Sequence, residues 1–194
     1  MTAAIAKIAF VVLAVGWYLI RYEHARRSRR APVVHSARGP RETALLLISL
    51  TGLGIVPIAY IATGIPHFAD YSFRPWQAWL GILAAAAALL MFQLTHRALG
   101  RNWSVSLDVR EDHQLITDGI YRRIRHPMYS AFWLWALAQA LVLPNWVAGF
   151  AGLAGFGILF FGRIAEEERM MLEAFGGRYR DYMARTYRVI PLIF

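Results

Sequence analysis

The sequence predicts an all-α integral membrane protein with five transmembrane helices. Hydrophobic residues make up 58% of the 194 residues and charged residues only 17%, and the mean hydropathy is +0.39. These proportions are more apolar than those of soluble domains. A helix needs roughly 20 apolar residues to cross a bilayer core about 30 Å thick. A chain of this length therefore accommodates one compact bundle, and we expect a single membrane domain over residues 1–194.

Five apolar runs are the candidate transmembrane helices. The first has no short-residue cleavage site before the Arg-rich segment that follows, so we expect an uncleaved helix. The last two are joined only by Pro144 and Asn145, which predicts a tight antiparallel hairpin. We expect three N-terminal transmembrane helices in residues 1–99 and a core with the hairpin and a C-terminal tail in residues 100–194. The five runs are residues 3–20, 44–64, 76–99, 128–143 and 146–162.

The basic residues orient this bundle. Nineteen of the 21 lysine and arginine residues lie in residues 21–41, 97–125 and 163–188, which fall on one side of the predicted membrane. Cytoplasmic loops carry such an excess, so we expect an outside N-terminus and a cytoplasmic C-terminus. This orientation explains the net charge of +9 and favours anionic lipid headgroups, rather than nucleic acid, as the partner.

Several site classes are excluded or disfavoured. The chain has no cysteine, which excludes disulfides, thiolate metal ligands and a cysteine nucleophile. His113 and His126 have no close carboxylate–histidine spacing, so we expect no metal. The glycines in the fifth run lie inside an apolar helix, which indicates close helix packing rather than a dinucleotide loop. Gln139, in the fourth run, is expected to form an interhelical hydrogen bond. These glycines are Gly149, Gly152, Gly155 and Gly157.

Polar residues gather where the fourth run begins. Pro127 suits the first turn of a helix, which leaves His126 at the N-terminal edge. Unpaired backbone N–H groups and the helix dipole at such an edge suit a carboxylate ligand. In a simpler interpretation, the neighbouring Arg122, Arg123 and Arg125 are ordinary interfacial anchors and His126 is a helix-start residue. Spacing alone favours this simpler interpretation.

A second polar group follows the fifth run. Arg163 and Glu167 are four residues apart, so on a continuing helix they share a face and could form a weak surface pair. Alternatively the two side chains diverge. Arg163 would then clamp a substrate carboxylate, and Glu167 would accept hydrogen bonds from hydroxyl or ammonium groups of a cofactor.

An ordered set of residues in the C-terminal half carries a resemblance to a known family. By these positions the chain resembles the isoprenylcysteine carboxyl methyltransferase family, including its bacterial and archaeal members, over residues 100–194. The N-terminal half shows no matching motif. The matching residues are His113-Gln-Leu-Ile116, Gly119-Ile-Tyr121, Arg125-His-Pro-Met-Tyr129, Gln139, Asn145, Arg163, Glu166 to Glu168, Phe175-Gly176, Tyr179, Tyr182 and Pro191.

The resemblance implies an S-adenosylmethionine-dependent carboxyl O-methyltransferase. Its substrate would be the carboxylate of an isoprenylcysteine-like lipid, S-adenosylhomocysteine would be the product, and a bacterial inner membrane is the expected location. Arg163 would bind the substrate, Arg163 and Glu167 would be the catalytic residues, and the cytoplasmic pocket would belong to the C-terminal half. The implied cofactor-binding residues are His113, Gln114, Leu115, Ile116, Tyr121, His126, Pro127, Met128, Tyr129 and Glu167.

Two other functions stay open at this point. A phospholipid amine N-methyltransferase shares part of the motif, but an amine nucleophile must be deprotonated and would favour a carboxylate beside it. A carboxylate acceptor is already ionised near pH 7 and needs no general base, so Arg163 favours the carboxyl acceptor. The chain could also be a non-catalytic membrane scaffold, in which case Glu167 and His126 should tolerate replacement.

Overall fold

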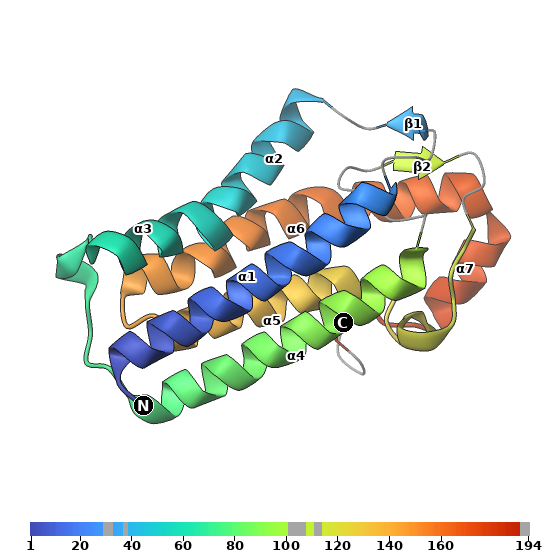
Figure 1. The fold of residues 1–194 in the computed structure, drawn as a ribbon. Coiled ribbons are helices and arrows are strands. Elements are labelled where there is room, and N and C mark those ends of the chain that lie inside the picture. The colour runs from blue at the N-terminus through green and yellow to red at the C-terminus, as the bar shows by residue number, and fades with distance from the viewer. Residues whose placement is uncertain (29–32, 37–38, 101–107, 111–113, 191–194) are drawn as a thin grey trace.

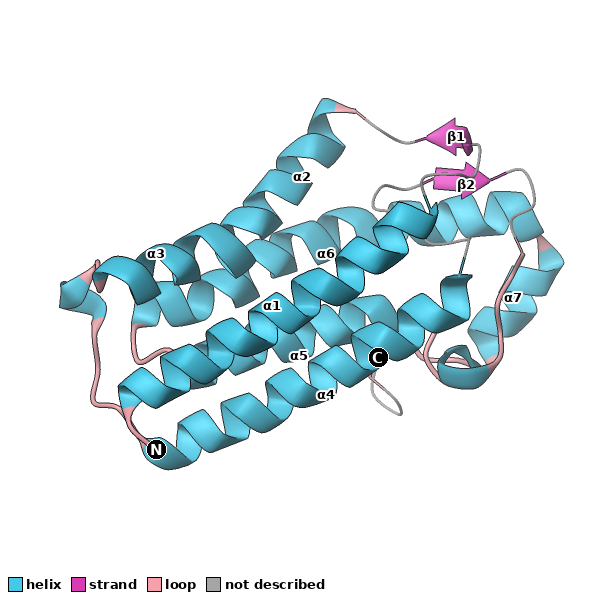
Figure 2. Ribbon diagram, in the orientation of Figure 1, coloured by secondary structure: helices cyan, strands magenta, loops and turns pink. Residues whose placement is uncertain are grey.

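The structure is a computed structural model, and it describes residues 1–28, 33–36, 39–100, 108–110 and 114–190. Long helices run alongside one another over most of it, and a small sheet and a short helix lie at one end (Figure 1, Figure 2). Short 3₁₀ turns form at His67–Ala69 and Gly119–Arg122. The helices are α1 (Ala3–Ser28), α2 (Pro40–Leu50), α3 (Val56–Thr63), α4 (Pro75–Leu99), α5 (Pro127–Val142), α6 (Trp146–Phe175) and α7 (Gly177–Ala184).

Four helical stretches in the described residues are long and apolar enough to cross a bilayer. The fifth predicted crossing is α5, which has only 16 residues. At 1.5 Å per residue it is about 24 Å long, shorter than a typical hydrocarbon core. The fifth crossing therefore stays a prediction. The four stretches are Ala3–Arg26, Pro40–Thr63, Pro75–Leu99 and Trp146–Phe175.

Two features differ from the sequence-based expectation. The all-α prediction misses a small antiparallel sheet, in which β1 (Val33–Ser36) pairs with β2 (Asp108–Arg110). Both strands lie outside the apolar runs, where hydropathy carries no signal. The last apolar run ends at residue 162, whereas the helix that contains it, α6, continues to Phe175. Helix-favouring Arg, Glu, Met and Leu residues sustain it beyond the apolar part.

A π-helical segment joins α2 and α3 into one rod. In this segment, Thr51–Ile55, the Val56 N–H donates to the Thr51 carbonyl five residues earlier. Pro57 has no N–H, so the carbonyl of Gly52 lacks the equivalent donor within the helix. Gln139 Nε2 supplies it from α5 at 3.0 Å, and also donates to the Ala148 carbonyl of α6 at 2.7 Å. The predicted interhelical role of Gln139 is confirmed.

Small residues set the spacing between the helices. A Cβ added at Gly155 would lie 2.8 Å from the Ile48 carbonyl oxygen, and one added at Gly52 would lie 2.2 Å from that of Ala151. The rod and α6 therefore touch backbone to backbone, which confirms the packing role predicted for the α6 glycines. Between α4 and α5, Ala85, Ala88 and Ala138 are fully buried in the same manner.

Candidate active site

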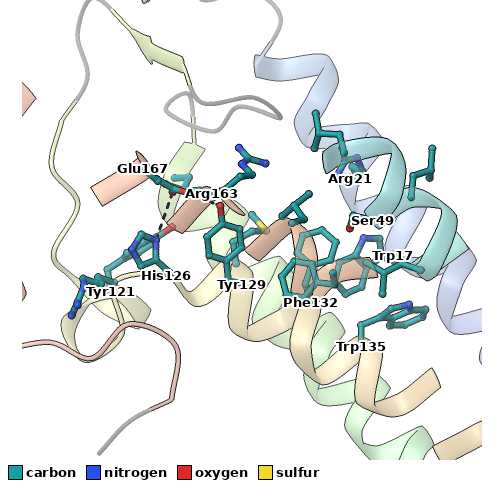
Figure 3. Close-up of a pocket in the computed structure, with 18 of the residues that line it drawn as sticks. Trp17, Arg21, Ser49, Tyr121, His126, Tyr129, Phe132, Trp135, Arg163 and Glu167 are labelled. Atoms are coloured by element: carbon teal, nitrogen blue, oxygen red, sulfur yellow. Dashed lines mark hydrogen bonds and ion pairs between the residues drawn. The ribbon is translucent and has the colours of Figure 1, made fainter. Parts of the chain in front are cut away.

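One large cavity runs between the helices and is polar at one end. Its volume is about 640 Å³, within the roughly 300–1,000 Å³ of small-molecule sites. Residues from α5, α6 and α7 line the polar end. Residues of α1 and the α2–α3 rod line the other end, which is mostly apolar and rich in aromatic rings but also includes Arg21 and Ser49 (Figure 3). The polar lining includes Gln114, Tyr121, Arg125, His126, Tyr129, Arg163, Glu167, Tyr179 and Tyr182.

Glu167 is the centre of the polar end. The Tyr129 hydroxyl donates to Glu167 Oε2 at 2.5 Å, and His126 Nδ1 lies 3.6 Å from Glu167 Oε1 (Figure 3). His126 and Tyr129 are buried, and their rings stack with centroids 5.6 Å apart. Burial lowers the pKa of the His126 imidazole, but Glu167 and Glu168 raise it by more, so this pKa lies above its ordinary value. The imidazole therefore favours its charged form beside two carboxylates.

Arg163 and Glu167 diverge, although they share a helix. Arg163 Nη2 lies 3.2 Å from Glu42 Oε1 of α2, and both side chains are buried. Arg163 Nε is buried with no hydrogen-bond partner among the described residues. The first alternative, a simple surface pair of Arg163 with Glu167, is not the arrangement in the structure. Arg163 also lines the cavity, and a guanidinium has more N–H donors than the Nη2 group that contacts Glu42.

Glu168 binds the C-terminal tail to the start of α5. It accepts hydrogen bonds from Arg125 Nε at 2.7 Å and from Arg188 Nη2 at 2.7 Å. The N–H of Arg125 donates to the Tyr187 carbonyl at 2.8 Å, and that of His126 to the Arg188 carbonyl at 2.9 Å. The backbone N–H of His126 is therefore paired with the tail and is not among the groups left for a ligand at this helix edge.

The same tail forms a wall of the cavity. Tyr179 and Tyr182 of α7 are almost fully buried and line the cavity. The Tyr182 hydroxyl donates to the Tyr121 carbonyl at 2.7 Å, which ties α7 to the turn before α5. Burial raises the pKa of the Tyr121 phenol well above its ordinary value, so this wall stays uncharged.

The structure brings most of the predicted site residues to this cavity. Pro127 is buried at the first turn of α5, as predicted, but is not part of the lining. His113 lies outside the described residues. The lining residues among those predicted are Gln114, Leu115, Ile116, Tyr121, His126, Met128, Tyr129, Arg163 and Glu167.

Sequence reasoning missed the contribution of the N-terminal half. Glu42 contacts Arg163, and Trp17 and Ser49 line the cavity. The only local signal for Glu42 was an acidic residue two positions after Pro40, at the start of an apolar run. Glu168 was part of the family motif and Arg188 only the end of a basic segment, and their pairing depends on the tail folding back.

Comparison with known proteins bears on this arrangement. The model of the isoprenylcysteine carboxyl methyltransferase (ICMT) family matches residues 79–173, which cover α5 and most of α4 and α6. A solved structure of the eukaryotic intramembrane Ras methyltransferase ICMT is also similar. It has a TM-score of 0.53 and 25% identity, over 82% of this chain and 55% of that chain. This chain belongs to the ICMT family.

Curated ICMT relatives match at low to moderate identity. The protein-S-isoprenylcysteine O-methyltransferase of Dictyostelium discoideum is 29% identical over 62% of this chain and 51% of that protein. The Schizosaccharomyces pombe protein-S-isoprenylcysteine O-methyltransferase is 39% identical over 43% of this chain and 35% of that protein. Arabidopsis thaliana protein-S-isoprenylcysteine O-methyltransferase B is 25% identical over the full length of both chains.

The relatives differ in how much of their length this chain covers, and one of them also matches its N-terminal half. Our chain spans about half the length of the Dictyostelium relative and about a third of the Schizosaccharomyces pombe relative, but all of the Arabidopsis one. The Arabidopsis match includes the N-terminal half, where no motif was visible. All three are eukaryotic proteins, so a bacterial or archaeal origin stays a prediction.

Proposed function

We propose that this integral membrane protein transfers a methyl group from S-adenosylmethionine to the carboxylate of an isoprenylcysteine-like lipid. The observation that carries the proposal is the single cavity that joins a charged end, at Arg163 and Glu167, to an aromatic and aliphatic end. Such a cavity suits a polar cofactor and an amphipathic acceptor side by side. The activity named in the relatives is of this kind.

The polar end fits the cofactor. When bound, S-adenosylmethionine would supply an electrophilic methyl group on a sulfonium centre with a neutral thioether leaving group. Glu167, held by Tyr129 and close to His126, would accept hydrogen bonds from ammonium or hydroxyl groups. Gln114 to Ile116 and Met128 would complete this end, with Tyr121 against a flat ring or the cation.

Arg163 would hold the acceptor. Arg163 lines the cavity and contacts Glu42 through Nη2, and a guanidinium has five N–H donors, so it can also donate to a carboxylate in the cavity. That carboxylate is ionised near pH 7, and no general base is needed. The role of Arg163 is to hold the nucleophilic oxygen in line with the methyl group.

The apolar end would hold the lipid chain. Phe10 and Trp17 of α1 line it together with Leu53 of the rod and Phe132 of α5, and the rings of Trp17 and Phe132 are in contact, with centroids 5.0 Å apart. Some lining residues are also exposed on the outer surface of the bundle, namely Tyr18, Leu50 and Ile58. The cavity thus reaches the lipid-facing surface between α1 and the rod, so a chain could enter it directly from the bilayer.

The orientation proposed from the arginines accords with this assignment. The C-terminal ends of α1, α4 and α6 and the helix α7 lie at the same end of the bundle (Figure 1), and in the sequence the basic segments overlap or follow these helix ends. An active site on the cytoplasmic side, with the N-terminus outside, five crossings and a bacterial inner membrane, completes the proposal.

Calorimetric titration of the purified protein with S-adenosylhomocysteine tests the cofactor assignment. We expect saturable binding that weakens in Glu167→Ala and persists in Arg163→Ala, which should instead lose turnover with a farnesylcysteine analogue. Glu166→Ala is the matched control, because Glu166 pairs with exposed Arg169 on the surface. Absence of binding by folded wild-type protein would overturn the proposal. Loss of cofactor binding in both variants would overturn the role of Arg163.

A further inference from the structure

A buried carboxylate stands next to Arg163 outside the cavity lining. Glu42 is 6% exposed and Arg163 8% exposed, and Arg163 Nη2 lies 3.2 Å from Glu42 Oε1. Arg163 lines the cavity, but Glu42 does not. The guanidinium therefore spans from Glu42 to the cavity.

The position of Glu42 is suited to holding a charge. It lies in the first turn of α2, two residues after Pro40, where the helix dipole favours an anion. A carboxylate buried at this depth is costly unless a cation compensates it, and Arg163 is the cation in contact. Each charge thus fixes the location of the other.

Arg163 also has a competing partner on its own helix. Glu167 lies four residues further along α6, the spacing at which arginine and glutamate side chains pair on one face. In the structure Glu167 instead bonds Tyr129 and lies close to His126. Glu42 attracts the guanidinium from the opposite side, so Glu167 and Arg163 stay available for separate ligands.

We propose that Glu42 is a positioning residue for the acceptor site. By pairing with Nη2 of Arg163, it keeps the guanidinium away from Glu167 and beside the cavity, where the other N–H groups can bind an acceptor carboxylate. This inference rests on the proposed function. It predicts that Glu42 matters for ligands that carry a carboxylate and not for their neutral counterparts.

A neighbouring residue separates this role from helix docking. Arg41 also ties α2 to α6, through a hydrogen bond from Nη2 to the Gly162 carbonyl at 3.0 Å. It is exposed and absent from the cavity lining. Arg41→Gln therefore removes a tie between the same two helices without touching the charge on Arg163.

The test compares an acidic ligand with its neutral ester. Dissociation constants of N-acetyl-S-farnesylcysteine and its methyl ester are measured on the purified full chain saturated with S-adenosylhomocysteine. We expect the wild type to prefer the acid by at least about tenfold, which corresponds to one charge-assisted contact. Glu42→Gln should reduce this preference to within about twofold of unity, whereas Arg41→Gln should retain it.

Two further experiments test the proposal if Glu42→Gln does not fold or if its effect is indirect. If Glu42→Gln does not fold, Glu42→Asp keeps the charge but shortens the side chain by one methylene, and it should show a reduced preference. In an Arg163→Gln background, Glu42→Gln should change the preference no further, since the two residues act as one unit. A preference retained in the Glu42 variant tested would overturn the proposal.

The outcomes also separate this inference from the proposed function. If the wild type binds S-adenosylhomocysteine but shows no preference for the acid, the acceptor role of Arg163 fails, and the role of Glu42 fails with it. If the wild type does not bind S-adenosylhomocysteine at all, the cofactor assignment itself fails. Only a wild-type preference that survives in the Glu42 variant contradicts Glu42 alone.

Discussion

The Tyr129 hydroxyl donates a 2.5 Å hydrogen bond to Oε2 of Glu167, which joins the first turn of α5 to the polar extension of α6. Tyr129 is buried, so little water competes for this bond. It fixes the carboxylate that we assign to the cofactor. The position of the Glu167 carboxylate thus depends on the packing of α5 against α6.

Removing this hydroxyl tests whether the orientation of Glu167 matters. Tyr129→Phe keeps the ring and loses one hydrogen bond to a charged acceptor, worth about 1.5 kcal/mol. We expect the affinity for S-adenosylhomocysteine to fall roughly tenfold in calorimetry. Tyr187→Phe is the control, because Tyr187 is partly exposed and outside the cavity lining. Equal affinity in wild type and Tyr129→Phe would contradict the assignment.

Breaking the tail network should destabilise the fold as well as the site. Glu168→Ala leaves Arg125 and Arg188 without their shared carboxylate, and loss of one partner of a buried pair costs roughly 3 kcal/mol. We expect a lower unfolding midpoint in denaturant and weaker S-adenosylhomocysteine binding. Glu173→Ala, which removes an exposed partner of Arg169, should change little. Equal midpoints for both variants would show that the network contributes no stability.

The raised pKa of His126 predicts a pH dependence of stability. The protonated imidazole is favoured by Glu167 and Glu168, so its contribution is complete below the unfolded-state pKa of about 6.5. That contribution is lost as the pH rises through the higher folded-state pKa. We expect the melting temperature to fall as the pH rises above about 6.5, and to fall less in His126→Asn. Parallel melting curves for the two proteins would rule out His126 as the source.

The close contact between the rod and α6 gives a packing prediction. Gly52→Ala would place a methyl group 2.2 Å from the Ala151 carbonyl oxygen, so backbone must move. Overpacking of this kind costs typically 1–3 kcal/mol, and we expect a clear fall in melting temperature. Gly54→Ala, on the same π-helical segment, meets only the Leu50 side chain at an ordinary 3.5 Å. If both variants melt alike, the two helices are not packed as closely as described.

Local sequence signals account for the positions of the helices. The apolar runs locate the helices of the bundle, Pro127 marks the start of α5, and Asn145 marks the hairpin. The structure shows why asparagine suits position 145: its side chain accepts a hydrogen bond from the Ala148 N–H and donates one to Asp70. These features depend on hydropathy and on the residues that favour helix starts, and both signals can be recognised within a few residues of sequence.

The parts that could not be predicted depend on contacts between distant segments. Nothing local couples Glu42 to Arg163, and neither hydropathy nor spacing indicates that Arg188 returns to Glu168. Resemblance selected Tyr121, His126 and Tyr129, but not the aromatic residues of α1 that line the other end of the cavity. The apolar end of the cavity is therefore visible only once the first half of the chain is packed against the second.

Direct detection of methyl transfer tests the central claim. Purified protein is incubated with S-adenosylmethionine labelled in its methyl group and with N-acetyl-S-farnesylcysteine, and the lipid product is then treated with alkali. A carboxyl methyl ester releases labelled methanol under these conditions, and we predict such release by the wild type and its loss in Arg163→Ala. No label in the lipid, or label that alkali does not release, as on a phospholipid amine, would contradict the proposed function.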